Sequence, residues 1–168
     1  MTTSMRRLFF LGVLLAIVGS ASAQLPKVLL KDISGKAIST DTLSNDGKPF
    51  IIDFFATWCK PCNRELDAIA EVYEEWQEET GVKIIIVSND RAQDINKVKP
   101  LVDNHGWEYE MVLLDPNNEF SRGLGNNSGA MPYTVIVDGK GKIVYRHTGY
   151  NDGAESELIE KVRELVKE

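Results

Sequence analysis

Short apolar runs alternate with longer amphipathic stretches along the chain. Residues 50–55, 82–87 and 111–114 are apolar almost throughout, a pattern typical of strands that are buried on both faces of a sheet. Residues 61–79 and 155–166 place apolar side chains three and four positions apart, which predicts amphipathic helices. The side chains expected to face inward in the second of these helices are Leu158, Ile159, Val162, Leu165 and Val166.

Two hairpins are expected, one at each end of this pattern. Residues 27–30 and 37–38 are expected to pair through the turn Ser34-Gly35. Residues 133–137 and 143–146 are separated by Asp-Gly-Lys-Gly, a sequence with a strong preference for turns. The N-terminal hairpin therefore precedes the buried strands, and the second hairpin follows them.

Less regular helices are expected between the strands. Residues 90–104 have a helical pattern, but Pro100 is expected to break or kink that helix. A short helix is expected at 119–122. Strands thus alternate with helices in the first half of the chain and pair as a hairpin in the second half. This order predicts an α/β fold, in which helices flank both faces of a mixed central sheet.

The first residues have the pattern of an export signal. Arg6 and Arg7 precede an apolar run at 8–18, and the small residues at 21–23 form a cleavage site. We therefore expect a signal peptide at 1–23, cleaved after Ala23, and one domain at 24–168 in the periplasm. A membrane-anchored form is less favoured, because the apolar run is shorter than the ~20 residues that span a bilayer.

The charge of the chain bears on its partners. The net charge is −6, and loss of Arg6 and Arg7 with the signal peptide changes it to −8. An acidic chain without a basic run does not fit a nucleic-acid-binding protein. We expect a monomer that binds no nucleic acid.

The chain has two cysteines, Cys59 and Cys62. In an exported protein they would lie where disulfides persist. A disulfide between residues three apart closes a very small loop, so it restricts the unfolded chain little. The pair therefore fits reversible thiol–disulfide exchange better than structural stabilisation.

The position of the pair predicts which sulfur attacks. Cys59 lies where the strand at 50–55 gives way to a helix, so the unpaired N–H groups and the positive end of the helix dipole face its sulfur and favour the thiolate. Lys60 adds a nearby cation, and Pro61 fits the first turn, where its missing N–H costs nothing. Cys62 lies one turn further and is expected to be shielded. Cys59 is thus the expected nucleophile and Cys62 the resolving thiol, with Lys60 and Pro61 as tuning residues.

Asp53 is the one charged residue of the strand at 50–55. A carboxyl group buried there would have a raised pKa and would suit the role of base for the Cys62 thiol. The alternative is that Asp53 lies at a strand edge in water.

The segment from Asp53 to Cys62 resembles the active-site signature of thioredoxin, in which the matching Asp is a buried acid and Trp58 flanks the nucleophile. The continuation through 63–66 is more similar to the exported TlpA/ResA-like branch, which inserts a strand and a helix that match 90–114 here. Later segments at 113–117 and 131–138 also resemble that branch, and the similarity extends over essentially the whole mature chain. It implies a thioredoxin fold and a thiol–disulfide oxidoreductase that needs no cofactor.

The resemblance also implies a place for the substrate. It predicts a cis bond between Met131 and Pro132, which would bring residue 131 beside Cys59 and leave its backbone groups free to pair with an extended substrate. Trp58, Met131 and Pro132 are therefore the expected substrate-binding residues. Disulfide-containing exported proteins, apocytochrome c among them, are the expected partners, together with a membrane electron donor.

Two departures from the thioredoxin pattern affect these expectations. Thioredoxin pairs its buried Asp with a Lys on the next strand, whereas only Lys83, at the mouth of that strand, could approach Asp53 here. The dipeptide Lys60-Pro61 also differs from the Pro-His pair of strong oxidants. We therefore expect a reductant, with a potential more reducing than about −200 mV.

Three other functions remain open at this point. Zinc binding or copper delivery would use both cysteines, with His105 and His147 as further candidate ligands. A thiol peroxidase needs a Thr three residues before its cysteine, and Ala56 occupies that position. A non-catalytic exported binding module would carry the cysteine pair without activity. No metal site is expected.

Overall fold

The structure is a computed structural model that describes residues 25–167, so the expected signal peptide at 1–23 lies outside the described residues. The strands are β1 (Leu29–Asp32), β2 (Ala37–Ser39), β3 (Phe50–Phe55), β4 (Lys83–Ser88), β5 (Met111–Leu114), β6 (Tyr133–Val137) and β7 (Ile143–Thr148). The α-helices are α1 (Lys60–Thr80), α2 (Val98–His105), α3 (Glu119–Gly123) and α4 (Ala154–Val166).

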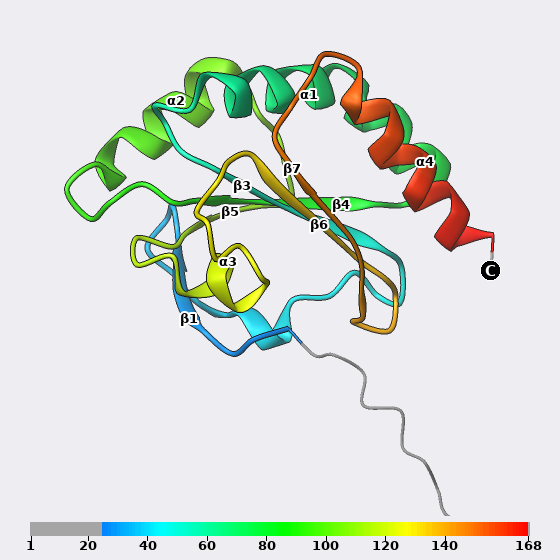
Figure 1. Ribbon diagram of the computed structural model, residues 1–168, viewed down its shortest axis with the longest axis horizontal. Helices are drawn as coiled ribbons and strands as arrows, with labels where there is room; N and C mark the ends of the chain where they lie inside the picture. The colour runs from blue at the N-terminus through cyan, green and yellow to red at the C-terminus, as the bar shows by residue number, and fades with distance from the viewer. Residues whose placement is uncertain (1–24, 168) are drawn as a thin grey trace, which may run out of the picture.

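The strands form a mixed sheet in the order β2-β1-β5-β4-β3-β6-β7 (Figure 1). Neighbours β3 and β4 are parallel, as are β4 and β5, whereas β3 pairs with β6 in the antiparallel sense. The N-terminal hairpin β1–β2 joins the sheet through an antiparallel pair with β5. The segment that carries α2 and β5 is the expected insertion, and its strand β5 lies between β4 and the hairpin.

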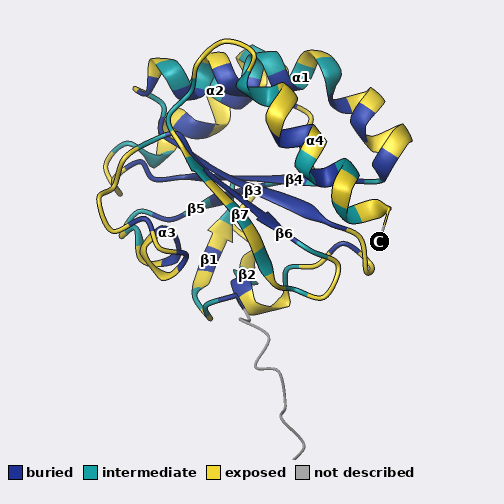
Figure 2. Ribbon diagram, turned by 45° about the vertical axis from the view of Figure 1, so that its right-hand side comes forward, coloured by how far each residue is buried: buried dark blue, intermediate teal, exposed yellow. Residues whose placement is uncertain are grey.

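Helices cover both faces of the sheet, as expected. Helices α1, α2 and α4 lie on one face, and α3 lies on the other (Figure 1). Every residue of β3 is buried, and the central strands are buried along most of their length (Figure 2). Because side chains alternate between the faces of a strand, Ile51 and Phe55 pack with α1, while Ile52 and Phe54 pack on the side of α3. Asp53 therefore points toward the α1 side.

Helix α1 begins and ends where the sequence predicts. Pro61 lies in its first turn, where the absence of an N–H leaves no backbone bond unmade. Gly81 follows the helix with a φ of 68°, a left-handed conformation that glycine adopts without strain, and its N–H donates to the carbonyl of Gln77. The buried stripe of α1 consists of Cys62, Glu65, Leu66, Ile69, Tyr73, Trp76 and Thr80.

Two local predictions are wrong. A 3-10 turn at Ile95–Lys97 precedes α2, which begins only at Val98, so the helix does not extend back to residue 90. Pro100 consequently lies in the first turn of α2 and neither breaks nor kinks it, because no helical bond is required of its nitrogen there. In α4, Val166 is 43% exposed rather than inward-facing, since it lies in the last turn. None of the helices within residues 25–167 combines the length and the apolar character needed to cross a membrane.

Candidate active site

A tight turn between β3 and α1 presents the first cysteine. The N–H of Cys59 donates to the carbonyl of Ala56 at 2.9 Å, which closes the turn. Cys59 has an extended backbone, with φ −83° and ψ 93°, and forms the N-cap of α1. The N–H of Cys62 points at Cys59 Sγ, 3.3 Å away. The expected placement of Cys59 at the positive end of the helix dipole is thus confirmed.

The two cysteines form a disulfide, with their Cα atoms 5.3 Å apart. They differ in access, because Cys62 is completely buried, whereas Cys59, although only 4% exposed, lines an open hollow of about 370 Å³. The other residues around this hollow are Trp58, Lys60, Pro61, Gly129 and Met131. A molecule that approaches from solvent therefore meets the sulfur of Cys59 first.

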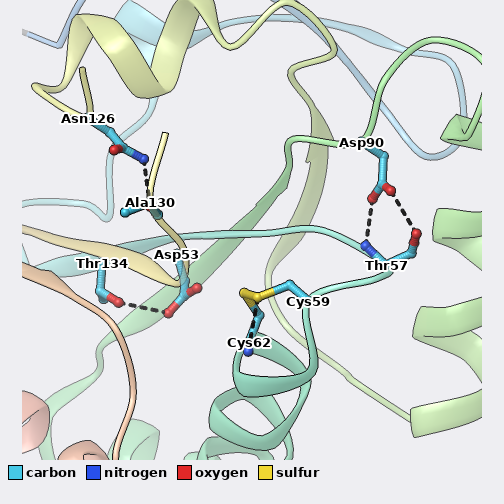
Figure 3. Close-up of a disulfide and its surroundings, with 8 residues drawn as sticks. All are labelled: Asp53, Thr57, Cys59, Cys62, Asp90, Asn126, Ala130 and Thr134. Atoms are coloured by element: carbon cyan, nitrogen blue, oxygen red, sulfur yellow. Dashed lines mark hydrogen bonds between the residues drawn. A yellow bond between two sulfur atoms is a disulfide. The ribbon is translucent and has the colours of Figure 1, made fainter. Parts of the chain in front are cut away.

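The residues expected to contact a substrate lie around the same hollow. Trp58 is 69% exposed, which is unusual for a large aromatic side chain. The bond between Met131 and Pro132 is cis, as expected, and Met131 lies beside Cys59. Within the described part of the chain, the backbone N–H and carbonyl of Met131 make no hydrogen bond to another backbone group. The side-chain amide of Asn126 donates to the carbonyl of Ala130 at 3.0 Å and so holds the segment that leads to Met131 (Figure 3).

Asp53 lies to one side of the disulfide and is completely buried (Figure 3). Its Oδ2 accepts a hydrogen bond from the hydroxyl of Thr134 at 3.1 Å, and its Oδ1 has no partner among the described residues (Figure 3). Burial raises the pKa of Asp53 to about 7, and the bond from Thr134 opposes that rise. The alternative of an Asp53 exposed at a strand edge is wrong. Lys83 forms an ion pair with Glu110 at 3.1 Å instead of approaching Asp53.

A second buried acid, Glu65, was not expected from the sequence. It follows Cys62 by three residues on α1, so both side chains lie on one face of the helix, and it is only 2% exposed. Its Oε2 has no partner among the described residues. Burial, and then the charges of Asp53 and Glu155, raise the pKa of Glu65. The sequence did contain a signal for its burial. Glu65 follows Cys62 by three residues and precedes Ile69 by four, so the three side chains share one face of the helix.

A third buried acid, Asp90, lies on the other side of Cys59 and was also missed as a site residue. Its Oδ2 accepts hydrogen bonds from the N–H of Thr57 at 2.8 Å and the hydroxyl of Ser88 at 2.9 Å, and its Oδ1 accepts from the hydroxyl of Thr57 at 2.7 Å (Figure 3). Asp90 is 1% exposed. The thirty-three residues that separate Asp90 from Thr57 explain why local patterns did not indicate this contact.

The histidines make other contacts. His105 Nδ1 lies 2.7 Å from Asp67 Oδ1, and the ring of His147 stacks on that of Tyr145. Within residues 25–167, no group of three or more His, Cys, Asp or Glu side chains has the arrangement of a metal site.

Comparison with known proteins places this geometry in a family. The AhpC/TSA family model matches residues 21–146. The chain is 30% identical over 147 residues to the thiol-disulfide oxidoreductase ResA of Halalkalibacterium halodurans, covering 88% of this chain and 77% of that protein. It is 31% identical over 134 residues to the thiol:disulfide interchange protein DsbE of Haemophilus influenzae, covering 80% of this chain and 67% of that protein.

A solved structure extends the similarity to the fold. The solution structure of an uncharacterized thioredoxin-like protein from Porphyromonas gingivalis is 61% identical, with a TM-score of 0.75, over 87% of this chain and 94% of that one. The thioredoxin-like fold is therefore confirmed. The ResA and DsbE relatives both carry thiol–disulfide chemistry in their names. A close cysteine pair at a helix N-terminus is the group that such chemistry requires. The chain thus belongs to the AhpC/TSA family, as a thioredoxin-like thiol–disulfide oxidoreductase of the ResA and DsbE type.

Proposed function

We propose that this enzyme is an exported reductant of disulfides in other exported proteins, with Cys59 as the attacking sulfur and Cys62 as the resolving one. The observation that carries this proposal is the asymmetry of the pair. Cys59 lines the open hollow and receives the N–H of Cys62, whereas Cys62 is completely buried. Dipoles that converge on Cys59 favour its thiolate, which is the reactive form in disulfide exchange.

The proposed cycle transfers two electrons to the client. The Cys59 thiolate attacks one sulfur of a client disulfide, forms a mixed disulfide and releases the other client sulfur as a thiolate. The Cys62 thiolate then attacks Cys59 Sγ and displaces the remaining client sulfur. The client ends as a dithiol, and the enzyme ends with the Cys59–Cys62 disulfide that the structure contains.

The second step requires Cys62 to lose a proton in a place without water. We infer that this proton goes to the coupled pair of Asp53 and Glu65, in which Asp53 is the acceptor and Glu65 is protonated at neutral pH. Asp53 lies beside the disulfide, and Glu65 lies one turn along the same face of α1 as Cys62. Burial raises the pKa of Asp53 to about 7, which brings it closer to the pKa of a thiol and makes it a better base than an exposed carboxylate. Burial and the charge of Asp53 raise the pKa of Glu65 further, to about 10, so Glu65 keeps its proton.

The client is expected to dock across the hollow beside Cys59. Trp58 offers an exposed aromatic surface, and the unpaired backbone of Met131 offers a donor and an acceptor for an extended segment. Pro132 holds Met131 at that place. Lys60 adds a positive charge beside Cys59, and Pro61 fixes the first turn, so both tune the reactivity of the sulfur.

Export and the wider partners follow from the N-terminal sequence and from the direction of electron flow. The expected signal peptide at 1–23 would place the enzyme in the periplasm. We propose that it acts there as a monomer. A reductant in that compartment must be reduced again after each cycle, so we propose a membrane electron donor. Apocytochrome c is one proposed client among exported proteins.

Trapping tests the roles of the two sulfurs. In the Cys62→Ser variant the mixed disulfide cannot be resolved, so client proteins should remain bonded to Cys59 and appear on non-reducing gels. Cys59→Ser is the matched control and should capture none. Equal capture by both variants would overturn the assignment of the nucleophile.

A redox titration tests the direction of electron flow. Equilibration of the pair with dithiothreitol or glutathione buffers should give a potential more reducing than about −200 mV. A value near −120 mV, which is typical of strong oxidants, would contradict a reductant while leaving the exchange chemistry intact.

A further inference from the structure

We propose that Asp90 is a positioning residue for the reactive cysteine, acting through Thr57. Asp90 follows Ser88 at the end of β4 and opens the inserted segment that carries α2 and β5. Within residues 25–167, its hydrogen bonds go to Thr57 and Ser88 and not to either sulfur. Its contacts instead go to the turn that precedes Cys59, so its effect on chemistry must pass through that turn.

Both oxygens of the Asp90 carboxylate accept hydrogen bonds. Oδ2 accepts from the Thr57 N–H at 2.8 Å and the Ser88 hydroxyl at 2.9 Å, while Oδ1 accepts from the Thr57 hydroxyl at 2.7 Å. The backbone N–H of Asp90 donates to the Ser88 hydroxyl oxygen at 3.1 Å. A carboxylate with three donors at these distances is held in one place, and charge-assisted bonds of this kind are the strong ones in proteins.

The position of Asp90 is itself fixed by the central strands β3 and β4. Ser88 pairs with Phe55 in the parallel register of β3 and β4, and the N–H of Asn89 donates to the carbonyl of Phe55 at 2.8 Å. Phe55 is the last residue of β3, two positions before Thr57. The end of β4 and the start of the turn are therefore tied together twice, once through the backbone and once through Asp90.

The turn before Cys59 connects the contacts of Asp90 to the position of Cys59 Sγ. Thr57 and Trp58 are its two middle residues, and the bond from the Cys59 N–H to the Ala56 carbonyl closes it. The extended backbone of Cys59, which aims its sulfur at the N–H of Cys62, depends on the direction in which this turn ends. If the Thr57 N–H loses its acceptor on Asp90, it has no other hydrogen bond within residues 25–167, and the turn can tilt. The thiolate would then lose part of its helix-terminal stabilisation.

An effect of Asp90 through its charge and an effect through positioning would shift the ionisation of Cys59 in opposite directions. An experiment can therefore distinguish the two. By charge alone, the anion of Asp90 disfavours a thiolate nearby, so removing it would make Cys59 ionise at lower pH. If Asp90 acts by positioning, removing it weakens the contact between the thiolate and the α1 amides, so Cys59 would ionise at higher pH. Thr57→Val removes one bond without any change of charge.

The experiment measures iodoacetamide alkylation of Cys59 in the reduced protein across pH, in four variants. Thr57→Val and Asp90→Asn should each raise the pH midpoint of alkylation, by about one unit, and slow the reaction at pH 7 by about threefold, because the gain in intrinsic nucleophilicity offsets part of the loss of thiolate. Thr57→Ser keeps both bonds and should match the wild type. Ser88→Ala leaves both Thr57 bonds in place, so it should lower stability and keep the midpoint. Near-ultraviolet circular dichroism checks the fold of each variant.

The outcomes decide the proposal. A fall of the midpoint in Asp90→Asn, or midpoints of Thr57→Val and Asp90→Asn equal to that of the wild type, would overturn positioning. If Asp90→Asn does not fold, the comparison of Thr57→Val with Thr57→Ser decides alone. The proposal rests on the assignment of Cys59 as the nucleophile, and the wild type tests that separately. If wild-type Cys59 were alkylated no faster than glutathione, that result would contradict the proposed function itself.

Discussion

Buried carboxyl groups lie on both sides of the disulfide, and the two sides differ in how their oxygens are bonded. On the side of β4, Asp90 accepts three hydrogen bonds. On the side of β6, Asp53 accepts one, and Oδ1 of Asp53 and Oε2 of Glu65 have no partner among the described residues. All three residues are at most 2% exposed, so burial alone does not distinguish them.

The number of donors decides what a buried carboxyl group can do. A carboxylate that receives several hydrogen bonds is stabilised as an anion and serves as a fixed anchor. A carboxyl group without donors is stabilised in its protonated form, so its pKa rises and it can exchange a proton near neutral pH. The anchor lies beside the turn before Cys59, and the proton-exchanging pair lies on the side of Cys62. The enzyme thus separates the placement of one sulfur from the deprotonation of the other.

The largest expected effect comes from removing the proton-exchanging pair. The double variant Asp53→Asn with Glu65→Gln keeps the size of both side chains but removes both ionisable groups of the coupled pair. We expect the resolution step, in which Cys62 attacks the mixed disulfide, to slow by about 10²–10⁴-fold, the usual contribution of general acid–base catalysis. Stopped-flow measurement of client release from a preformed mixed disulfide tests this.

The comparison with Asp90 sharpens that result. Asp90→Asn should change the alkylation of Cys59 and leave the resolution step within a few fold of the wild type, because Asp90 lies away from Cys62. If the double variant resolved at the wild-type rate, then water or the client would accept the proton, and the role assigned to Asp53 and Glu65 would be lost.

The next largest effect concerns stability. Asp90→Ala leaves the Thr57 N–H and the hydroxyls of Thr57 and Ser88 without their acceptor. Unsatisfied buried donors cost about 1–3 kcal/mol each, and the hydroxyls can turn toward other groups, so we expect a loss of about 3 kcal/mol in the free energy of unfolding. Urea unfolding of the oxidised protein at pH 7 measures it.

The matched control for Asp90→Ala is Asp53→Asn. It removes a carboxyl group with one hydrogen bond and no other donor, so we expect a change of less than about 1 kcal/mol at the same pH. Equal losses in the two variants would show that donor number does not separate the two sides of the disulfide.

The fold was largely predictable because its signals are local. Each residue of β3 is apolar except Asp53, and the stripe of α1 repeats every three to four residues, so both elements were identified from the sequence. The start of α2 was not, because the helical pattern was extended back over polar residues that form a turn. Pro100 was therefore expected to interrupt the helix, whereas it lies in the first turn of α2.

The site was predictable where its members lie close together along the chain, and not where they lie far apart. The cysteine pair lies within four residues, and burial of Asp53 follows from its apolar neighbours. Glu65 was within reach, since an acid three residues after a buried cysteine lies on the same helix face. The bond between Thr134 and Asp53 joins residues 81 positions apart, and that between Asp90 and Thr57 joins residues 33 apart, so only the fold brings them together.

A smaller effect is expected in the pH dependence of stability. The pKa of Asp53 in the folded protein, about 7, is above its ordinary value of 3.8. The favourable contribution of the protonated group is therefore fully present below 3.8 and is lost as pH rises through about 7. We expect the wild type to lose about 2 kcal/mol between pH 5 and pH 8 relative to Asp53→Asn, which carries no titrating group there.

Urea unfolding of both proteins at several pH values between 5 and 8 gives this difference directly. Subtraction removes the contributions of groups that do not interact with Asp53, so the difference reports the coupled pair of Asp53 and Glu65. Parallel curves would mean that Asp53 is ionised throughout this range, and the contrast with Asp90 would then lie in geometry alone.

The smallest effect is expected from Thr134→Val, which keeps the shape of the side chain and removes the donor to Asp53 Oδ2. That hydrogen bond lowers the pKa of Asp53, so its loss should raise the pKa further, by about one unit. Carbon-13 NMR of the Asp53 carboxyl group across pH measures the shift, and Thr57→Val, which alters only the side of Asp90, should leave it unchanged. A shift of the Asp53 titration in Thr57→Val but not in Thr134→Val would mean that the two sides are coupled through the disulfide. Placement and proton transfer would then be properties of one connected site.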